Sequence, residues 1–344
     1  MAQHDLTNGD ETDAEAGLLD IVFGHWRSQI LRSLATLSVA DHLAGGPLTA
    51  AEVAAREGSV TDRTFRLMRA GVEIGLLTAD ADGRFGSTPL LDTMRKESPR
   101  SLHPVAMGLT SPWLTLSWRL LPEAVQTNIE PATAALGTDL FNYLEGNPEE
   151  EREFSDLMAA LTTLWAGDVA DLIDTTDVNR AIDVGGSSGS LLRQLQERNP
   201  RLRGVIFDRP NVAREIAPSV AAGDFASRTE VVGGDFFVSV PAGDLYLLKM
   251  ILHDWDDERG VTILTRCREA MEPNGRVAIV EMIMGGPAAP GFAALMDLNM
   301  LMACQDGRER TLSEFDALLH AAGLRRTATY AKLSGHSVIE ASAS

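Results

Sequence analysis

The side chains best suited to chemistry follow short apolar runs that indicate strands. One run, residues 181–184, includes Asp183 and leads into Gly-Gly-Ser-Ser-Gly at 185–189 and then a leucine-rich helical pattern. Strand, glycine turn and helix together form the arrangement that binds nucleotide-type cofactors at the carboxyl end of a parallel strand. The turn has neither the full G-x-G-x-x-G spacing nor a phosphate-binding lysine, which argues against a dinucleotide or a nucleoside triphosphate.

Acidic residues follow the next two predicted strands. Asp208 ends the run at 204–207 and lies about 20 residues after the glycine turn, where an acid can accept hydrogen bonds from ribose hydroxyls. Asp235 and Phe236 follow the run at 230–232, and an acid beside an aromatic ring suits an adenine base. For both acids, a helix cap or a turn is the structural alternative.

The run at 245–248 leads into Lys-Met-Ile-Leu-His-Asp-Trp-Asp-Asp-Glu at 249–258. His253 and the acids Asp254, Asp256 and Asp257 resemble a metal-binding set. Acids at the start of a helix, where they complement its dipole, explain the same pattern without a metal. We therefore expect no metal site.

Five motifs in order carry a family resemblance. They are Asp-Val-Gly-Gly-Ser-Ser-Gly at 183–189, Asp-Arg-Pro at 208–210, Gly-Asp-Phe-Phe at 234–237, Leu-Lys-Met-Ile-Leu-His-Asp-Trp at 248–255 and Gly-Arg-Glu-Arg-Thr at 307–311. The chain resembles the S-adenosylmethionine-dependent O-methyltransferases of the plant caffeic-acid and hydroxyindole type. That family includes bacterial members that modify polyketides and other aromatic natural products. The resemblance covers nearly the whole chain.

The resemblance implies transfer of a methyl group to an aromatic hydroxyl, with S-adenosylhomocysteine as the by-product. His253 matches the family's general base, and Glu281 and Glu309 match two flanking carboxylates. A neutral imidazole is a good base near neutral pH. A neighbouring carboxylate can fix its tautomer and stabilise the imidazolium, as it does in hydrolase triads.

The resemblance also implies the residues around both ligands. Those expected at S-adenosylmethionine are Asp183, Gly185, Gly189, Asp208, Asp235, Phe236, Lys249, Trp255 and Thr162. Those expected around the acceptor are Phe154, Met158, Asp254, Met300 and Cys304. Two positions depart from the family pattern: Ser187 replaces the third glycine of the turn, and Cys304 stands where plant relatives often carry a polar amide.

The elements that position these residues belong to the α/β class. From residue 178 onwards, strand and helix patterns alternate, which predicts a mostly parallel, Rossmann-like sheet covered on both faces. A final hairpin, 324–331 with 336–340, adds an antiparallel edge strand. We predict a disordered tail at 1–15, a winged-helix-like dimerisation domain at 16–108 and the S-adenosylmethionine-binding catalytic domain at 109–344.

The N-terminal pattern of helices followed by a small hairpin is that of a winged helix, for which DNA binding is the alternative to dimerisation. Arg63, Arg66 and Arg69 lie in the helix before the wing. The formal net charge of −19 opposes binding to nucleic acid or to an anionic membrane surface. We therefore expect a homodimer formed through this domain, with a small aromatic acceptor as the other partner.

The remaining composition excludes several classes. Among 344 residues there are two cysteines, Cys267 and Cys304, too few for a disulfide framework. The acidic N-terminus does not resemble a signal peptide, and no apolar run is long enough for a membrane span, so a cytoplasmic location is expected. The alternatives that stay open are N- or C-methylation, a non-methylating decarboxylase or hydroxylase on the same fold, and a ligand-sensing winged-helix regulator.

Overall fold

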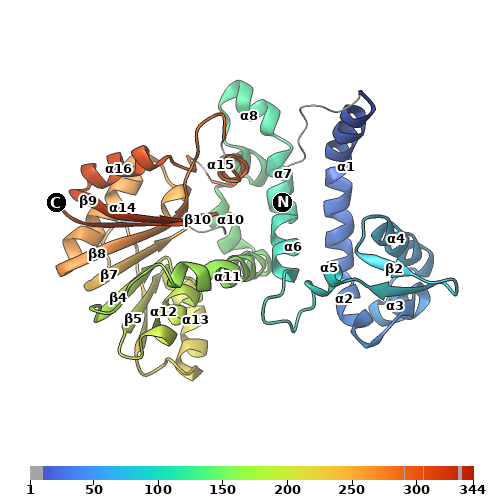
Figure 1. Ribbon diagram of the computed structural model, residues 1–344, viewed down its shortest axis with the longest axis horizontal. Coiled ribbons are helices and arrows are strands. Elements are labelled where there is room, and N and C mark those ends of the chain that lie inside the picture. Colours follow the sequence, from blue (N-terminus) through green and yellow to red (C-terminus); the bar gives the residue numbers. More distant parts are fainter. Residues whose placement is uncertain (1–10, 290, 305, 332–334) are drawn as a thin grey trace. The chain divides into compact units, whose positions relative to one another are not determined.

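The computed structural model describes residues 11–289, 291–304, 306–331 and 335–344 (Figure 1). The chain divides into two compact units, one ending at Ser111 and the other running from Pro112 to Ser344. The sequence placed this division after residue 108. Our prediction of a disordered tail is wrong at residues 11–15, which form the first turns of helix α1, and residues 1–10 lie outside the described part. Alanine and glutamate favour helix in this segment, and its acids suit a helix N-terminus.

The first unit is the predicted winged-helix arrangement. Its helices are α1 (Glu11–Thr36), α2 (Val39–His42), the 3-10 turn η1 (Leu43–Gly45), α3 (Ala50–Glu57), α4 (Thr61–Glu73), α5 (Pro89–Asp92) and α6 (His103–Leu109); its strands are β1 (Leu48–Thr49), β2 (Leu77–Ala79) and β3 (Arg84–Ser87). Strands β2 and β3 form the antiparallel wing, and β1 pairs with the outer side of β3. Thr49 and Glu52 form the capping box that begins α3. Leu34, Met68 and Phe85 lie in one buried core that joins α1, α4 and the wing.

The second unit begins with a run of helices and continues as an α/β sheet. Its helices are α7 (Pro112–Trp118), α8 (Leu121–Thr127), α9 (Pro131–Leu136), α10 (Leu140–Gly146), α11 (Pro148–Ala170), α12 (Ser190–Arg198), α13 (Pro210–Ala222), the 3-10 turn η2 (Leu252–Asp254), α14 (Asp257–Ala270), α15 (Ala293–Ala303) and α16 (Leu312–Ala321). Its strands are β4 (Arg180–Val184), β5 (Arg203–Asp208), β6 (Thr229–Gly233), β7 (Gly243–Lys249), β8 (Met271–Met282), β9 (Leu324–Ala331) and β10 (His336–Ala343).

The strands form one sheet in the order β6-β5-β4-β7-β8-β10-β9. Strands β4 to β8 are parallel, and β10 runs antiparallel to both β8 and β9. The predicted antiparallel edge is confirmed. Strand β10 lies between β8 and β9, and β9 is the outermost strand (Figure 1). The strand order reverses between β4 and β7, and ligands of such sheets bind at the carboxyl ends of the strands flanking this switch point.

Alternate residues of the central strands enter two separate cores, one on each face of the sheet. Ile182 and Tyr246 pack with α14 and α16 on one face. Ala181 and Leu247 pack with α11, α12 and α13 on the other. Burial on both faces explains why these strands appear in the sequence as continuous apolar runs.

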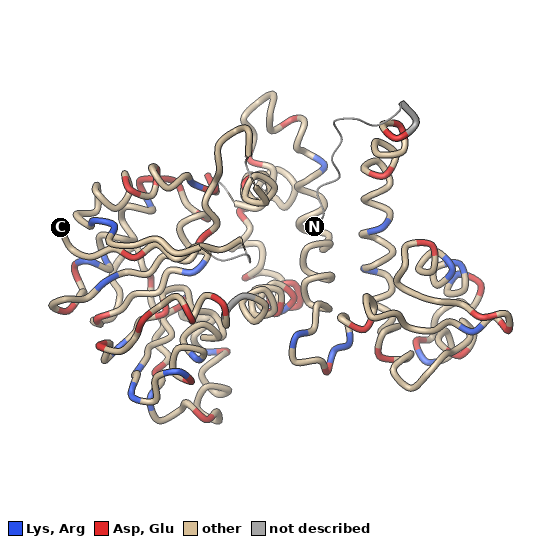
Figure 2. The backbone as a smooth tube through the Cα atoms, viewed as in Figure 1, with Lys and Arg blue, Asp and Glu red and all other residues tan. Residues whose placement is uncertain are grey.

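Acidic residues are spread over both units, interspersed with basic ones (Figure 2). Over the part of the chain that the structure describes, no helix has the length and apolarity needed to cross a bilayer. The cytoplasmic location stays a prediction.

Candidate active site

A pocket of about 520 Å³ lies at the switch point of the sheet. One wall consists of the carboxyl ends of four parallel strands and the segments that follow them: 185–188 after β4, 208–212 from the end of β5, 234–237 after β6, and residues 249–251, 254 and 255 from the end of β7. The opposite wall comes from α10 and α11, which contribute Phe141, Glu145, Glu151, Phe154, Ser155, Met158, Ala159 and Thr162. The pocket therefore lies where the glycine turn and its neighbouring strand ends were expected to form a ligand crevice.

The glycine turn is shaped by close packing. Gly185 has a φ of +67°, and a Cβ there would lie 2.4 Å from the Cδ1 of Ile251. Ser187 also adopts a left-handed φ, 47°, and its backbone N–H donates to the Asp208 Oδ2 at 2.8 Å. The turn thus accepts a serine in place of the family's glycine, at the cost of a conformation that L-residues avoid.

Gly189 does not line the pocket among the described residues, and its contact with the cofactor stays a prediction. It precedes α12 with a φ of +70°, and a Cβ at this position would lie 2.3 Å from the Cδ1 of Ile206. Close packing of the helix start against β5 is by itself enough to require a glycine here.

The other predicted cofactor residues line the pocket. The carboxylate of Asp208 accepts the backbone N–H groups of Ser187 and Arg209, so it also shapes the turn. Asp235 accepts the N–H of Phe237 at 2.8 Å. Both acids therefore take the structural role that the sequence left open, and both also face the pocket.

Two charged groups that interact electrostatically line the pocket, the buried Asp183 and the partly buried Lys249. Burial raises the pKa of Asp183 to about 7, although the positive charge of Lys249 opposes this shift. Burial lowers the pKa of Lys249, and the negative charge of Asp183 partly offsets that effect. A cofactor that carries both an ammonium and a carboxylate group is compatible with such an oppositely charged pair.

Aromatic rings surround the indole of Trp255. Phe237 and Phe236 meet it edge-on, at centroid distances of 4.9 and 6.0 Å. Phe141 of α10 stacks on the indole at a centroid distance of 6.1 Å with an interplanar angle of 20°. The guanidinium of Arg209 lies over the Phe141 ring, 5.4 Å from its centroid. The sequence predicted Trp255 and Phe236 but gave no sign of Phe141, which comes from a helix distant along the chain.

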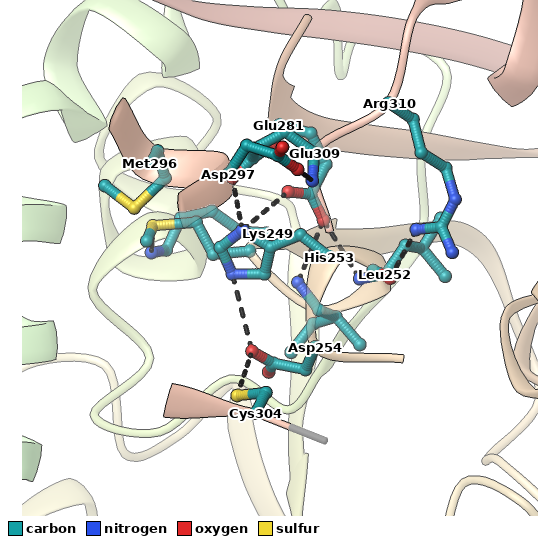
Figure 3. Close-up of polar contacts among 12 residues, drawn as sticks. Lys249, Leu252, His253, Asp254, Glu281, Met296, Asp297, Cys304, Glu309 and Arg310 are labelled. Carbon is teal, nitrogen blue, oxygen red and sulfur yellow. Dashed lines mark hydrogen bonds and ion pairs between the residues drawn. The ribbon is translucent and has the colours of Figure 1, made fainter. Parts of the chain in front are cut away.

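The predicted catalytic residues lie behind the pocket wall, around one buried imidazole (Figure 3). His253 Nδ1 lies 2.8 Å from Glu309 Oε1 and 3.5 Å from Glu281 Oε2. On the other side of the ring, Nε2 lies 3.6 Å from Asp254 Oδ1, and the Cys304 thiol donates to that same oxygen at 3.5 Å. Asp254 lines the pocket, so Nε2 is the ring nitrogen next to a residue of the pocket wall, whereas His253 itself is not among the lining residues.

The charges around His253 change its expected protonation. Burial alone would lower the pKa of the imidazole, but the negative charges of Glu281, Asp254 and Glu309 outweigh burial and raise this pKa to about 10. The neutral imidazole expected from the sequence is therefore the minor form at neutral pH. Burial also raises the pKa of Glu281, whose Oε2 has no hydrogen-bond donor among the described residues.

The turn that carries His253 is held from several directions. Glu281 Oε1 accepts the N–H groups of Ile251 and Leu252 at 3.0 and 2.9 Å. The N–H of Arg308 donates to the carbonyl of His253 at 2.8 Å. Met250, just before this turn, has a left-handed φ of 53°, and such strain in a non-glycine residue tends to occur at functional sites.

The predicted acceptor residues divide into two groups. Phe154, Met158 and Asp254 line the pocket. Met300 and Cys304 do not line it among the described residues and belong to a buried cluster with Trp113, against which Phe154 packs. These two residues thus lie one layer behind the wall, in the cluster that joins α15 to α7 and α10.

His253, Glu281 and Glu309 place one potential ligand atom each within 4.8 Å of one another, as a metal site would require. The hydrogen bonds of this cluster account for the same arrangement. Nδ1 of the imidazole contacts Glu309, and Glu281 holds the backbone through two N–H groups. The absence of a metal stays a prediction.

The strand order and the pocket at its switch point define a Rossmann-like methyltransferase domain, joined here to a winged-helix unit. A family model described as an O-methyltransferase domain matches residues 118–325, and one described as an O-methyltransferase dimerisation domain matches residues 19–96. The chain belongs to this family of S-adenosylmethionine-dependent O-methyltransferases.

Its relatives include both O-methyltransferases and an N-methyltransferase. The phenazine O-methyltransferase PhzM of Lysobacter antibioticus is 36% identical over 325 residues, which cover 94% of this chain and 95% of that protein. The phenazine-1-carboxylate N-methyltransferase of Pseudomonas aeruginosa is 31% identical, with 92% and 93% covered.

A solved structure from neocarzinostatin biosynthesis, an O-methyltransferase in complex with S-adenosylmethionine and 2-hydroxy-5-methyl naphthoic acid, is 32% identical. Its TM-score is 0.79, with 92% of this chain and 96% of that chain covered.

Proposed function

We propose that this enzyme methylates a hydroxyl group on a small aromatic acceptor, with His253 as the general base. The observation that carries the proposal is the contact set of His253: Nδ1 paired with Glu309 and Nε2 directed toward the pocket wall. Family membership gives the methyl donor, which supplies a methyl group on a positively charged sulfur and so needs no further activation.

The pKa of His253 fits a phenolic acceptor. An ordinary phenol has a pKa of about 10. Because the surrounding acids raise the pKa of His253, transfer of a proton from such a phenol to Nε2 is less unfavourable than transfer to an ordinary imidazole. Glu309 holds the proton of Nδ1, so Nε2 is the nitrogen that accepts, and the resulting imidazolium stays paired with the acids.

The rest of the chain's contribution is positional. The glycine turn, Asp208 and Asp235 would hold the nucleoside part of the donor, and Lys249, Asp183 and Thr162 line the part of the pocket suited to its amino-acid end. Phe154 and Met158 form an apolar wall for a flat acceptor. Alignment of the acceptor oxygen with the methyl group, in a site from which water is excluded, supplies the remaining acceleration.

Replacement of His253 by alanine tests the base. We expect turnover to fall about 100- to 10,000-fold, the usual contribution of a general base, while calorimetry finds nearly unchanged affinity for S-adenosylmethionine. His320, an exposed residue at the end of α16, supplies the matched control His320→Ala. Turnover within a few-fold of the wild type in His253→Ala would remove the base assignment.

Methylation of nitrogen is the second candidate, because one relative with 31% identity is an N-methyltransferase. An amine or ring nitrogen that attacks through a free lone pair gains little from a base. Mass spectrometry combined with titration of the product separates the two: O-methylation adds one methyl and abolishes the acidic phenol. In the His253→Ala variant, N-methylation would survive and O-methylation would not.

We also propose that the enzyme is a homodimer formed through its first unit. The family's dimerisation domain lies in this unit. Helix α1 leaves Leu18, Ile21 and Trp26 exposed by 63%, 75% and 56%. Such a run of large apolar side chains on one helix is typical of a surface covered by a partner.

A further inference from the structure

Arg310 is the largest side chain that the structure buries completely, with 1% of its surface exposed. A buried guanidinium is costly unless its N–H groups have partners. Nη1 donates to the carbonyl of Leu252 at 2.7 Å, and Nη2 donates to the carbonyl of Trp255 at 2.7 Å. Nε donates to Asp257 Oδ1 at 2.9 Å, and the side chain of Asp257 is 60% exposed.

These two carbonyls stand on either side of His253 and Asp254. One guanidinium therefore spans the whole of turn η2, from the carbonyl of the residue before His253 to the carbonyl of Trp255. Glu281 holds the N–H side of the same turn, as described above. Arg310 holds its carbonyl side (Figure 3).

The backbone of Arg310 is itself fixed to the segment that directly follows β8. The N–H of Met284 donates to the Arg310 carbonyl at 2.9 Å, and Arg310 forms a parallel bridge with Ile283, directly after β8. The preceding residue, Glu309, contacts Nδ1 of His253. Glu309 and Arg310 thus lie next to each other in one anchored segment. Glu309 contacts the imidazole of His253, and Arg310 holds the backbone that carries it.

We propose that Arg310 is a positioning residue for methyl transfer, which fixes the imidazole of His253 and the indole of Trp255 relative to each other. The inference rests on the proposed function of His253. The planar fork of an arginine can donate in two divergent directions at once, whereas a lysine offers a single nitrogen. Both side chains are positively charged, so replacing Arg310 by lysine changes the positioning of the turn while the charge is kept.

The test compares Arg310→Lys and Arg310→Gln with Arg326→Gln. Arg326 on β9 also pairs with an aspartate, Asp316, with Nε–Oδ1 and Nη2–Oδ2 distances of 2.6 and 2.8 Å, but it does not touch turn η2. Calorimetry with S-adenosylhomocysteine gives the fraction of folded sites, and turnover of a phenolic acceptor is expressed per site. Hydrogen exchange of residues 251–255 reports on the turn independently of activity.

We expect Arg310→Lys to remain folded, with kcat per site lowered about tenfold or more, the acceptor KM nearly unchanged and faster exchange at 251–255. Arg310→Gln should lose about 100-fold, the effect of a displacement of about 1 Å at a catalytic group. Arg326→Gln should match the wild type in all three measurements.

Wild-type kcat and unchanged exchange in Arg310→Lys would overturn the proposal, and this variant decides the matter if Arg310→Gln fails to fold. A wild-type enzyme that methylates no phenol would refute the proposed function alone. Hydrogen exchange would still decide whether Arg310 fixes the turn.

Discussion

Glu309→Gln is the change that best tests how the buried acids control the base. It keeps the size of the side chain but removes the charge 2.8 Å from His253 Nδ1. A hydrogen bond to a charged group contributes about 1.5–3 kcal/mol, and one pH unit corresponds to about 1.4 kcal/mol. The pKa of the imidazole should therefore fall by about one to two units from its raised value near 10.

The direction follows from the role of a base. In the wild type, kcat/KM should rise with pH into the alkaline range, because deprotonation of His253 produces the active form. In Glu309→Gln, the rising limb should begin about one to two units lower. The plateau should also fall, because the amide no longer selects the tautomer with its proton on Nδ1; the corresponding change in a hydrolase triad costs about 10,000-fold.

The assay is a pH series of kcat/KM at saturating S-adenosylmethionine, with a phenolic acceptor and methyl transfer followed by mass spectrometry. The control is Glu269→Gln, an exposed glutamate of α14 paired with Arg266, which should reproduce the wild-type profile. A Glu309→Gln profile with its rising limb at the wild-type pH would refute the electrostatic reasoning. A shifted limb with an undiminished plateau would refute the tautomer argument alone.

Four further changes test other parts of the structure. Ser187→Gly should raise the free energy of unfolding by at most about 1 kcal/mol in a denaturant titration. The substitution relieves the left-handed backbone strain, but the greater freedom of glycine in the unfolded chain partly offsets this gain. A clear loss of stability would contradict the strain at this position. Gly185→Ala should weaken cofactor binding about tenfold or more by calorimetry, and adding Ile251→Ala should restore part of that affinity by removing the Cδ1 atom in its way. Dialysis against a chelator should leave turnover unchanged, and a loss that added metal restores would make the His253 cluster a metal site. Light scattering should give twice the chain mass of 37.1 kDa for the wild type. Ile21→Asp should shift the population toward the monomer mass of 37.1 kDa. A dimer that persists unchanged in this variant would place the interface elsewhere.

The sequence predicted the sheet well because each central strand is buried on both faces. Such strands appear as short apolar runs, and the polar residue that ends each run marks the ligand crevice. The same logic located Asp208, Asp235 and Lys249 in the pocket. It gives no means of separating Gly189, which does not line the pocket among the described residues, from the glycines that do, because a glycine required by packing against Ile206 has the same sequence signature as one required by a ligand.

Other features depend on tertiary contacts that no local pattern records. Phe141 enters the pocket because α10 packs near Trp255, and nothing in its own neighbourhood indicates this position. The raised pKa of His253 results from three acids converging in space, two of them on distant segments. A charged arginine is expected at the surface from its residue type alone. Arg310 is nevertheless buried, because its guanidinium donates to the carbonyls of the turn that carries His253.

The two walls of the pocket have separate origins in the chain. The loops after the parallel strands carry the proposed base and most of the residues that we propose for the methyl donor, whereas α10 and α11, together with the α15 layer behind Phe154, shape the opposite wall. Substitutions in these helices can remodel the acceptor's compartment without disturbing the strand ends. New acceptor preferences can therefore arise by divergence of residues 140–170 and 293–304. A chimera that exchanges these segments with a relative, but keeps Phe141 and Thr162 of the proposed donor side, should inherit that relative's acceptor while retaining its own donor affinity.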